Sequence, residues 1–155
     1  MLIEKSGDLL ASPCNVIAHQ CNCFSMMGAG IAKTIKEHYP VAYEADCRDA
    51  RKPKERLGGF SVGFDPKDKR LIANLYGQYR AGRIGRKTNY DALASAWINF
   101  LIYLRSTPPH IQVPMMIGVP YNIGCGLAGG DWDIVRKILD DGAKAEGVDV
   151  YAYKL

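Results

Sequence analysis

The fold is decided by the stretch Ile17-Ala18-His19-Gln20-Cys21-Asn22-Cys23-Phe24-Ser25-Met26-Met27-Gly28-Ala29-Gly30-Ile31-Ala32-Lys33. A short apolar run ends in polar side chains, passes through a loop, and opens a helix through Gly-Ala-Gly. Glycines at a helix entrance let the backbone approach a ligand closely, and the first N–H groups of the helix point outward at the positive end of its dipole. This combination predicts an anion site, most often one for phosphate.

A second glycine-rich stretch repeats the design about a hundred residues later, as Gly118-Val119-Pro120-Tyr121-Asn122-Ile123-Gly124-Cys125-Gly126-Leu127-Ala128-Gly129-Gly130-Asp131-Trp132. It also leads from an apolar run into a helix. We therefore expect the rest of the chain to hold the two loops opposite each other.

Length and composition indicate one ordinary globular domain spanning residues 1–155, with 48% apolar and 23% charged residues. The segment 92–104 is too short to cross a bilayer, and residues 1–5 lack the pattern of a signal peptide. Five cysteines without an export signal predict reduced thiols and a cytoplasmic location. The net charge of +4 suits an anionic ligand but does not demand a nucleic-acid partner. No membrane partner is expected.

Strands and helices are expected to alternate along the chain, which is typical of a sheet covered on both sides, a three-layer α/β/α domain. Apolar runs and alternation predict strands at 2–5, 15–19, 60–64, 71–76, 115–119 and 148–153. Helical periodicity and prolines predict helices at 28–38, 41–51, 89–105 and 132–146.

Three common phosphate sites do not fit the residues. A Walker A loop fails because the glycines at 28 and 30 do not precede Lys33 in the required spacing. A Rossmann turn fails because Lys33 stands where its third glycine belongs. A cysteine phosphatase fails because no cysteine has an arginine six residues later.

Four motifs, in this order and spacing, resemble those of the macrodomain family. They are Gly7-Asp8-Leu9, Ile17-Ala18-His19-Gln20-Cys21-Asn22, Gly28-Ala29-Gly30-Ile31-Ala32 and Gly124-Cys125-Gly126-Leu127-Ala128-Gly129. The resemblance is to the small stand-alone branch that contains ADP-ribose 1″-phosphate phosphatases and hydrolases of ADP-ribosyl glutamate. It implies a three-layer α/β/α macrodomain with a mixed central sheet, an ADP-ribose ligand, no cofactor, and a monomer.

The resemblance assigns the adenine end of the ligand to Asp8 and Leu9, with Asp8 accepting a hydrogen bond from the adenine amine. The alternative for Asp8 is an Asx turn that ends the first strand. An aromatic ring against adenine is expected from Tyr153, or instead from Tyr151.

The resemblance assigns the distal ribose to Asn22, for which capping of the loop is the alternative. Backbone amides of both loops are expected to hold the two phosphates. The residues assigned to this cradle are Gly28, Ala29, Gly30, Ile31, Asn122, Gly124, Cys125, Gly126, Leu127 and Ala128. We expect the Cys125 side chain to serve packing rather than nucleophilic attack.

Catalytic roles are implied for His19, Asp131 and Asn22. His19 could protonate a leaving oxygen or position water, and a structural histidine is its alternative. Asp131 could activate water, whereas its alternative is to cap the helix that begins at Trp132. The sequence departs from the glutamate-specific hydrolases, because Ala128 stands where their catalytic aspartate is expected and Lys87 is not a secure match for their lysine.

The leading hypothesis is therefore an ADP-ribose-binding hydrolase that converts ADP-ribose 1″-phosphate to ADP-ribose and phosphate. The alternatives are removal of ADP-ribose from a protein or nucleic acid, and a non-catalytic reader. The basic loop from Arg80 to Lys87, with tyrosines nearby, raises direct nucleic-acid binding, although such loops are usually solvated. His19, Cys21 and Cys23 alternate, but no further ligands complete a metal site, so no metal is expected.

Overall fold

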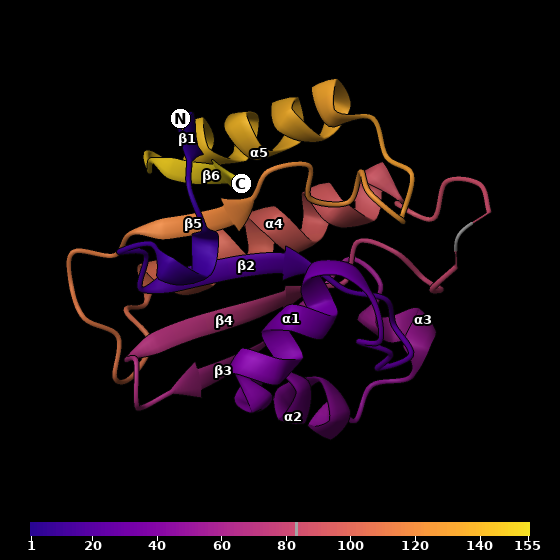
Figure 1. Cartoon of the computed structure of the whole chain (residues 1–155), viewed down its shortest axis with the longest axis horizontal. Coiled ribbons are helices and arrows are strands. Elements are labelled where there is room, and N and C mark those ends of the chain that lie inside the picture. Colours follow the sequence, from indigo (N-terminus) through magenta and orange to yellow (C-terminus); the bar gives the residue numbers. More distant parts are fainter. Residues whose placement is uncertain (83) are drawn as a thin grey trace.

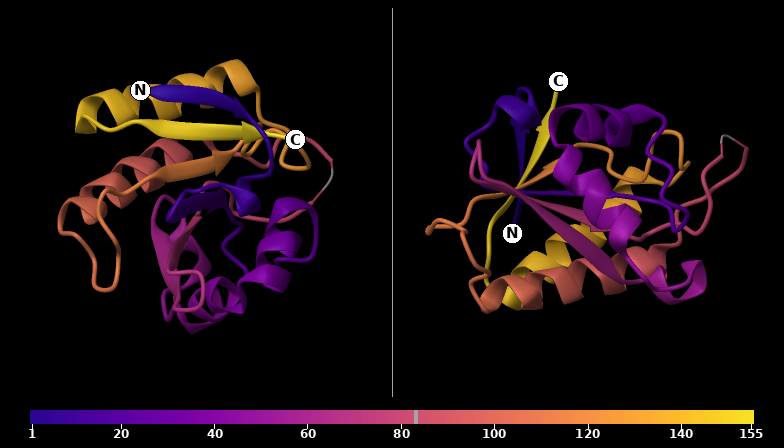
Figure 2. Two further views of the ribbon diagram at one scale, coloured as in Figure 1. Left: turned by 60° about the vertical axis from the view of Figure 1, so that its left-hand side comes forward. Right: turned by 90° about the horizontal axis from the view of Figure 1, so that it is seen from below.

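The computed structural model of the chain describes residues 1–82 and 84–155. One sheet of six strands lies between two layers of helices (Figures 1 and 2). The strands are β1 (Leu2–Ser6), β2 (Val16–Gln20), β3 (Phe60–Asp65), β4 (Arg70–Leu75), β5 (Ile117–Pro120) and β6 (Val150–Lys154). The helices are α1 (Gly30–His38), α2 (Pro40–Arg48), α3 (Pro53–Arg56), α4 (Tyr90–Arg105) and α5 (Trp132–Glu146), with a 3-10 turn η1 at Leu9–Ala11.

The sheet has the strand order β1-β6-β5-β2-β4-β3. All neighbours pair in parallel except β3, which runs antiparallel to β4 at one edge, so the sheet is mixed as expected. Strands β2 and β4 are buried along their whole length. Burial on both faces explains why each strand carries three consecutive apolar residues, 16–18 in β2 and 71–73 in β4, instead of alternating polar and apolar ones.

The larger core lies between the sheet and the α4–α5 layer. Its centre is formed by Trp97 and Phe100 of α4 and Leu139 of α5, all fully buried. The indole of Trp97 donates to the Leu139 carbonyl oxygen at 3.1 Å, and this bond satisfies the one polar atom that the ring takes into the core. Gly142 provides the space for the indole, since a Cβ there would lie 2.7 Å from Trp97 Cδ1.

Helices α1 and α2 cover the other face of the sheet, where Ile35, Tyr39 and Ala42 pack on Ile72 (Figure 2). Buried Arg70 orders the segment that follows β1. Its guanidinium donates to the carbonyl oxygens of residues 10, 12 and 14 at 2.7–2.9 Å. This segment is therefore fixed although it contains only one short turn.

The expected elements are present with shifted boundaries. The helix expected at 41–51 is Pro40–Arg48, because Pro40 occupies the first turn of α2 as well as ending α1. Pro53 likewise opens α3, which the sequence analysis missed. Among the described residues, no helix is both long and apolar enough to span a bilayer.

Candidate functional site

The carboxyl ends of the five parallel strands meet at one edge of the sheet, where the two glycine-rich loops emerge from β2 and β5 (Figure 1). A cavity of about 750 Å³ lies between these loops. Its walls come from residues 20–32 on one side, residues 120–128 on the other, and parts of the segment 78–82. In open α/β sheets, ligands bind outside the carboxyl ends of the strands, so both the place and the size suit a small-molecule site.

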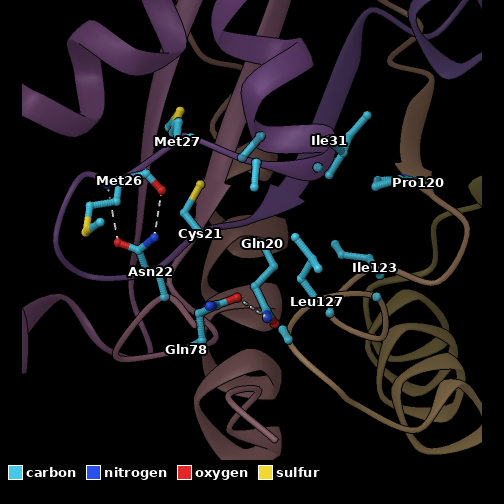
Figure 3. A pocket seen from close by; sticks show the side chains of 18 of the residues that line it. Gln20, Cys21, Asn22, Met26, Met27, Ile31, Gln78, Pro120, Ile123 and Leu127 are labelled. Atoms are coloured by element: carbon cyan, nitrogen blue, oxygen red, sulfur yellow. Dashed lines mark hydrogen bonds between the residues drawn. The ribbon is translucent and has the colours of Figure 1, made fainter. Parts of the chain in front are cut away.

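The first wall is organised by Asn22, which is 6% exposed and lines the cavity. Its Oδ1 accepts from the Phe24 amide at 2.9 Å. Its Nδ2 donates to the Met26 carbonyl oxygen at 2.8 Å, as Figure 3 shows. The side chain thus performs the loop capping that was one of its two interpretations. Contact with a ribose remains a prediction.

Helix α1 begins at this wall without a side-chain cap. Ala29 is the N-cap residue and makes no side-chain hydrogen bond, so the amides of Gly30, Ile31 and Ala32 have no acceptor among the described residues. All five residues from Gly28 to Ala32 line the cavity. An uncapped helix N-terminus that faces a cavity offers amide donors and a positive dipole to an anion.

The second wall is a tight loop closed by its own backbone. Gly130 donates to the Gly124 carbonyl oxygen at 2.9 Å, and Asn122 and Gly124 have positive φ angles of 63° and 72°. Residues 122, 124 and 126–128 line the cavity as expected. Cys125 does not: its Sγ lies 3.3 Å from the Ile123 carbonyl oxygen, and burial raises its pKa to about 11. Cys125 therefore contributes packing, as expected for its side chain.

A polar cluster joins the floor of the cavity to both flanking loops. Gln20 Nε2 donates to Gln78 Oε1 and to Thr88 Oγ1, each at 2.9 Å, and Thr88 donates to the Gly124 carbonyl oxygen at 2.6 Å. Gln78 Nε2 in turn donates to the Arg80 carbonyl oxygen. These bonds fix the orientation of the Gln20 amide and leave its buried Oε1 without a donor among the described residues (Figure 3).

His19 lies in the core rather than at the cavity. Its Nε2 is 2.7 Å from Asn74 Oδ1, and Asn74 Nδ2 donates to the Ala42 carbonyl oxygen and Ser61 Oγ. The amide of Asn74 is thereby oriented so that its oxygen accepts the His19 proton. Complete burial lowers the His19 pKa to about 4, so the ring is neutral near pH 7. The structure favours the structural alternative for His19.

Asp131 also stands outside the cavity lining. Its carboxylate accepts from the Asp133 amide at 2.9 Å and caps α5, while its own amide donates to the Tyr90 hydroxyl at 3.0 Å. The geometry favours the capping alternative over activation of water.

The residues assigned to adenine gather above β1 and β6, beyond one end of the cavity. Asp8 is exposed and accepts from the Leu10 amide at 2.9 Å, which is the turn that was its alternative interpretation, whereas the Leu9 side chain is buried in the core. Tyr153 lies beside Gly7, and its carbonyl oxygen accepts from the amide of Tyr121, a cavity residue. Tyr151, the other candidate, instead lines a second cavity of about 440 Å³ at the amino ends of β5 and β6.

The basic loop borders the opposite end of the cavity, through Ala81 and Gly82. The Arg80 guanidinium lies 5.6 Å from the Phe24 ring centroid and 5.4 Å from that of Tyr79. Arg83 of this loop lies outside the described residues. The Lys87 amide donates to the Ala128 carbonyl oxygen at 2.7 Å, which ties the loop to the second wall. The described part of the chain holds no cluster of three His, Cys, Asp or Glu residues able to bind a metal ion.

Comparison with solved structures identifies this arrangement. The macrodomain of Mycobacterium tuberculosis DarG matches with a TM-score of 0.77 and 24% identity, over 100% of this chain and 98% of that one. The macrodomain of Thermus aquaticus DarG matches with a TM-score of 0.77 and 21% identity, over 100% and 99%. The chain has the macrodomain fold. Thermosipho africanus DarTG, solved in complex with ADP-ribose, also matches, with a TM-score of 0.73 and 16% identity over 95% of this macrodomain and 39% of that chain.

Sequence comparison places this macrodomain in one family with an uncharacterised 17.5 kDa protein of the tk–vs intergenic region of Enterobacteria phage T4. The two are 33% identical over 127 residues, which is 80% of this chain and 77% of the phage protein. The ADP-ribose 1″-phosphate phosphatase of Aspergillus oryzae is 46% identical over 41 residues, only 26% of this chain and 20% of that enzyme. No family model matches the chain.

Sequence reasoning missed several residues that line this macrodomain cavity, namely Gln20, Lys36, Tyr43 and Gln78. Two of them carried a usable signal. Gln20 ends β2 two residues before Asn22, and Lys36 follows Ala32 at the helical spacing of four. Tyr43 and Gln78 reach the cavity through tertiary packing of α2 and the segment after β4, which no local pattern predicts.

Proposed function

We propose that this macrodomain binds ADP-ribose in the cavity between its two glycine-rich loops. The observation that carries the proposal is that an uncapped helix N-terminus and a tight glycine loop face each other across one cavity of about 750 Å³. Their amide donors suit a pyrophosphate, which is anionic and accepts hydrogen bonds from both sides. The complex of Thermosipho africanus DarTG with ADP-ribose supports the choice of ligand.

The order of the strands gives the ligand a direction. Asp8 and Tyr153 lie above β1 and β6, which suits adenosine at that end. Asn22 and Gln78 lie above β2 and β4, which suits the distal ribose (Figure 3). A bound ADP-ribose would therefore cross the sheet edge from β1 toward β4.

The residues of the cavity favour binding over hydrolysis. No carboxylate and no imidazole is among the described residues that line it, because His19 is in the core and Asp131 caps α5. General acid–base catalysis needs such a group within hydrogen-bonding reach of the reacting atoms. A reader of ADP-ribose is therefore the function that the geometry supports best.

Hydrolysis of ADP-ribose 1″-phosphate is the second candidate. Its support is the short similarity to the Aspergillus oryzae phosphatase and to an ADP-ribose 1″-phosphate phosphatase of Ajellomyces capsulatus, 46% identical over 44 residues. Release of phosphate from this ester by the purified protein would establish it. If the protein binds ADP-ribose but releases no phosphate, it is a reader.

The test of ligand binding is calorimetry with ADP-ribose on the wild type and on Ala29→Asp. An aspartate at this N-cap would accept from the α1 amides itself and repel the pyrophosphate. We expect Ala29→Asp to stabilise the fold by about 1 kcal/mol while weakening ADP-ribose at least about tenfold. Ala50→Asp, an equal charge change at an exposed site away from the cavity, is the matched control. If Ala29→Asp binds ADP-ribose with unchanged affinity, the N-terminus of α1 does not contact the ligand. If the wild type does not bind ADP-ribose, the proposed function is refuted.

A further inference from the structure

One positive charge is built into the wall of the cavity. Lys36 lies on α1, one helical turn after Ala32, and both residues line the cavity. The ammonium of Lys36 rests over the ring of Tyr43 on α2, 3.9 Å from the ring centroid. A cation at this distance from an aromatic ring is held in place by attraction to the ring face. The charge is therefore positioned before any ligand arrives.

Lys36 is the only charged residue among the described residues that line the cavity. No carboxylate of the described chain lies within ion-pair distance of its ammonium. Lys33, on the same helix, is exposed and does not line the cavity. The cavity thus combines amide donors at the start of α1 with one separate ammonium farther along the helix.

Lys36 belongs to the end of the cavity opposite Asp8. Its partner Tyr43 is carried by α2, which packs on β3 and β4, whereas Asp8 follows β1 at the other edge of the sheet. Tyr43 packs in one apolar cluster with Met27. Met27 and Asn22 lie on the side of the cavity away from Pro120 (Figure 3). In the proposed direction of the ligand, this is the end that receives the distal ribose.

We propose that Lys36 determines specificity by binding a second anionic group, a phosphate monoester on the distal ribose of the ligand. The proposal rests on the proposed binding of ADP-ribose. An ammonium has three donors and no acceptor, and it gains most from an ionised oxygen acceptor. Bare ADP-ribose presents only neutral hydroxyl groups at that end, so it leaves the charge of Lys36 unmatched.

The alternative is that Lys36 supports the pyrophosphate or the packing of α1. The two roles differ in what they do to ligands with and without the terminal phosphate. A role at the pyrophosphate or in packing affects both ligands equally. A role at the distal end affects only the phosphorylated one.

The experiment is calorimetry of wild type, Lys36→Met and Lys33→Met with ADP-ribose and with ADP-ribose 1″-phosphate. Methionine keeps the apolar stem of lysine, and Lys33→Met removes an equal charge from the same helix outside the cavity. We expect wild type and Lys33→Met to bind the 1″-phosphate about tenfold more tightly than ADP-ribose. In Lys36→Met this preference should disappear, with the affinity for ADP-ribose retained.

Three results would overturn the assignment of Lys36: no preference in the wild type, equal weakening of both ligands in Lys36→Met, or the same loss in Lys33→Met. Failure of the wild type to bind either ligand would instead refute the proposed function itself. Free phosphate is measured after each titration. If the ester is cleaved, the comparison moves to steady-state kinetics, where Lys36→Met should raise KM about tenfold at unchanged kcat, and a fall in kcat at unchanged KM would contradict the proposal.

Discussion

The buried His19 should make stability depend on pH in a way that one substitution removes. Protonation would add a second N–H to a ring whose proton already goes to Asn74, and the nearest acceptor recorded for it among the described residues is the weakly accepting Sγ of Cys21, 3.8 Å from Nδ1. The ordinary pKa of histidine is about 6.5, and burial lowers that of His19 to about 4. Because the folded pKa is the lower one, His19 contributes full stability above about pH 6.5. That contribution is lost as the pH falls toward 4.

The size of the effect follows from the two pKa values. The unfolded chain takes up a proton near pH 6.5 and the folded chain only near pH 4, so the full loss is about 3 kcal/mol. Between pH 7.5 and 4.5 the loss is about 2.5 kcal/mol, with a steepest slope of about 1.2 kcal/mol per pH unit. Such a loss is a large part of the total stability of a small domain.

The assay is urea unfolding, followed by tryptophan fluorescence, at several values between pH 4.5 and 7.5. His19→Gln removes the titrating group while keeping similar volume, and carboxylates that titrate in both proteins cancel in the difference. We expect the wild-type advantage over His19→Gln to shrink by about 2.5 kcal/mol from pH 7.5 to 4.5. His110→Gln, the same substitution at an exposed position, is measured alongside as the control for the exchange of residue type.

Parallel profiles of wild type and His19→Gln would refute this reasoning. They would mean that the ring takes up a proton in the folded state as readily as in the unfolded one. His19 would then reach solvent, and its role as a proton donor to a ligand would have to be reconsidered.

Three further predictions concern groups near the two glycine loops and the core. Asp131→Ala should lower the free energy of unfolding by about 1 kcal/mol, because the α5 cap is lost, and should leave the affinity for ADP-ribose unchanged in calorimetry. A loss of affinity without a loss of stability would contradict the capping role. Gly142→Ala should lower the melting temperature, because the new Cβ would lie 2.7 Å from the Trp97 ring. Since alanine usually stabilises a helix by about 1 kcal/mol relative to glycine, a rise in the calorimetric Tm would contradict this packing argument. Iodoacetamide at pH 7.5 should modify exposed Cys47 long before half-buried Cys125, whose pKa is raised to about 11. Peptide mass spectrometry that shows the reverse order would contradict the low reactivity expected of the Cys125 thiol.

The elements of the fold were predictable wherever local chemistry marks both ends. Helix α5 was expected at 132–146 and is found at Trp132–Glu146, because Asp131 caps its start and Gly147 adopts the left-handed conformation after its end. Boundaries at prolines were less certain. Pro40 and Pro53 each open a helix, and a proline that stops one helix looks the same in sequence as one that starts another.

The backbone of the candidate site was predictable and its side chains were not. The two loops were marked by their glycines and by the change of hydrophobic periodicity from that of a strand to that of a helix. Their amides could be assigned because a backbone donor needs no particular side chain. The direction of a side chain depends on which face of β2 meets which layer. His19 and Gln20 are adjacent in sequence, yet His19 points toward Asn74 and Gln20 toward Thr88 under the second loop. For Asp131 both capping and catalysis were open from the sequence, and its place outside the cavity lining is what separates them.

The order of the strands also constrains how the chain can be assembled. Strand β6 lies between β1 and β5 and pairs with both, so residues 150–154 join residues 2–6 to the centre of the sheet. On a ribosome, β1 emerges first but has no neighbour until the last strand has been released. Pairing over such a long separation in sequence is slow, because the intervening chain must be ordered first. The edge beneath Asp8 is thus completed last, and a nascent chain would hold the β2, β4 and β5 part of the cavity wall before it holds the part proposed to meet adenine.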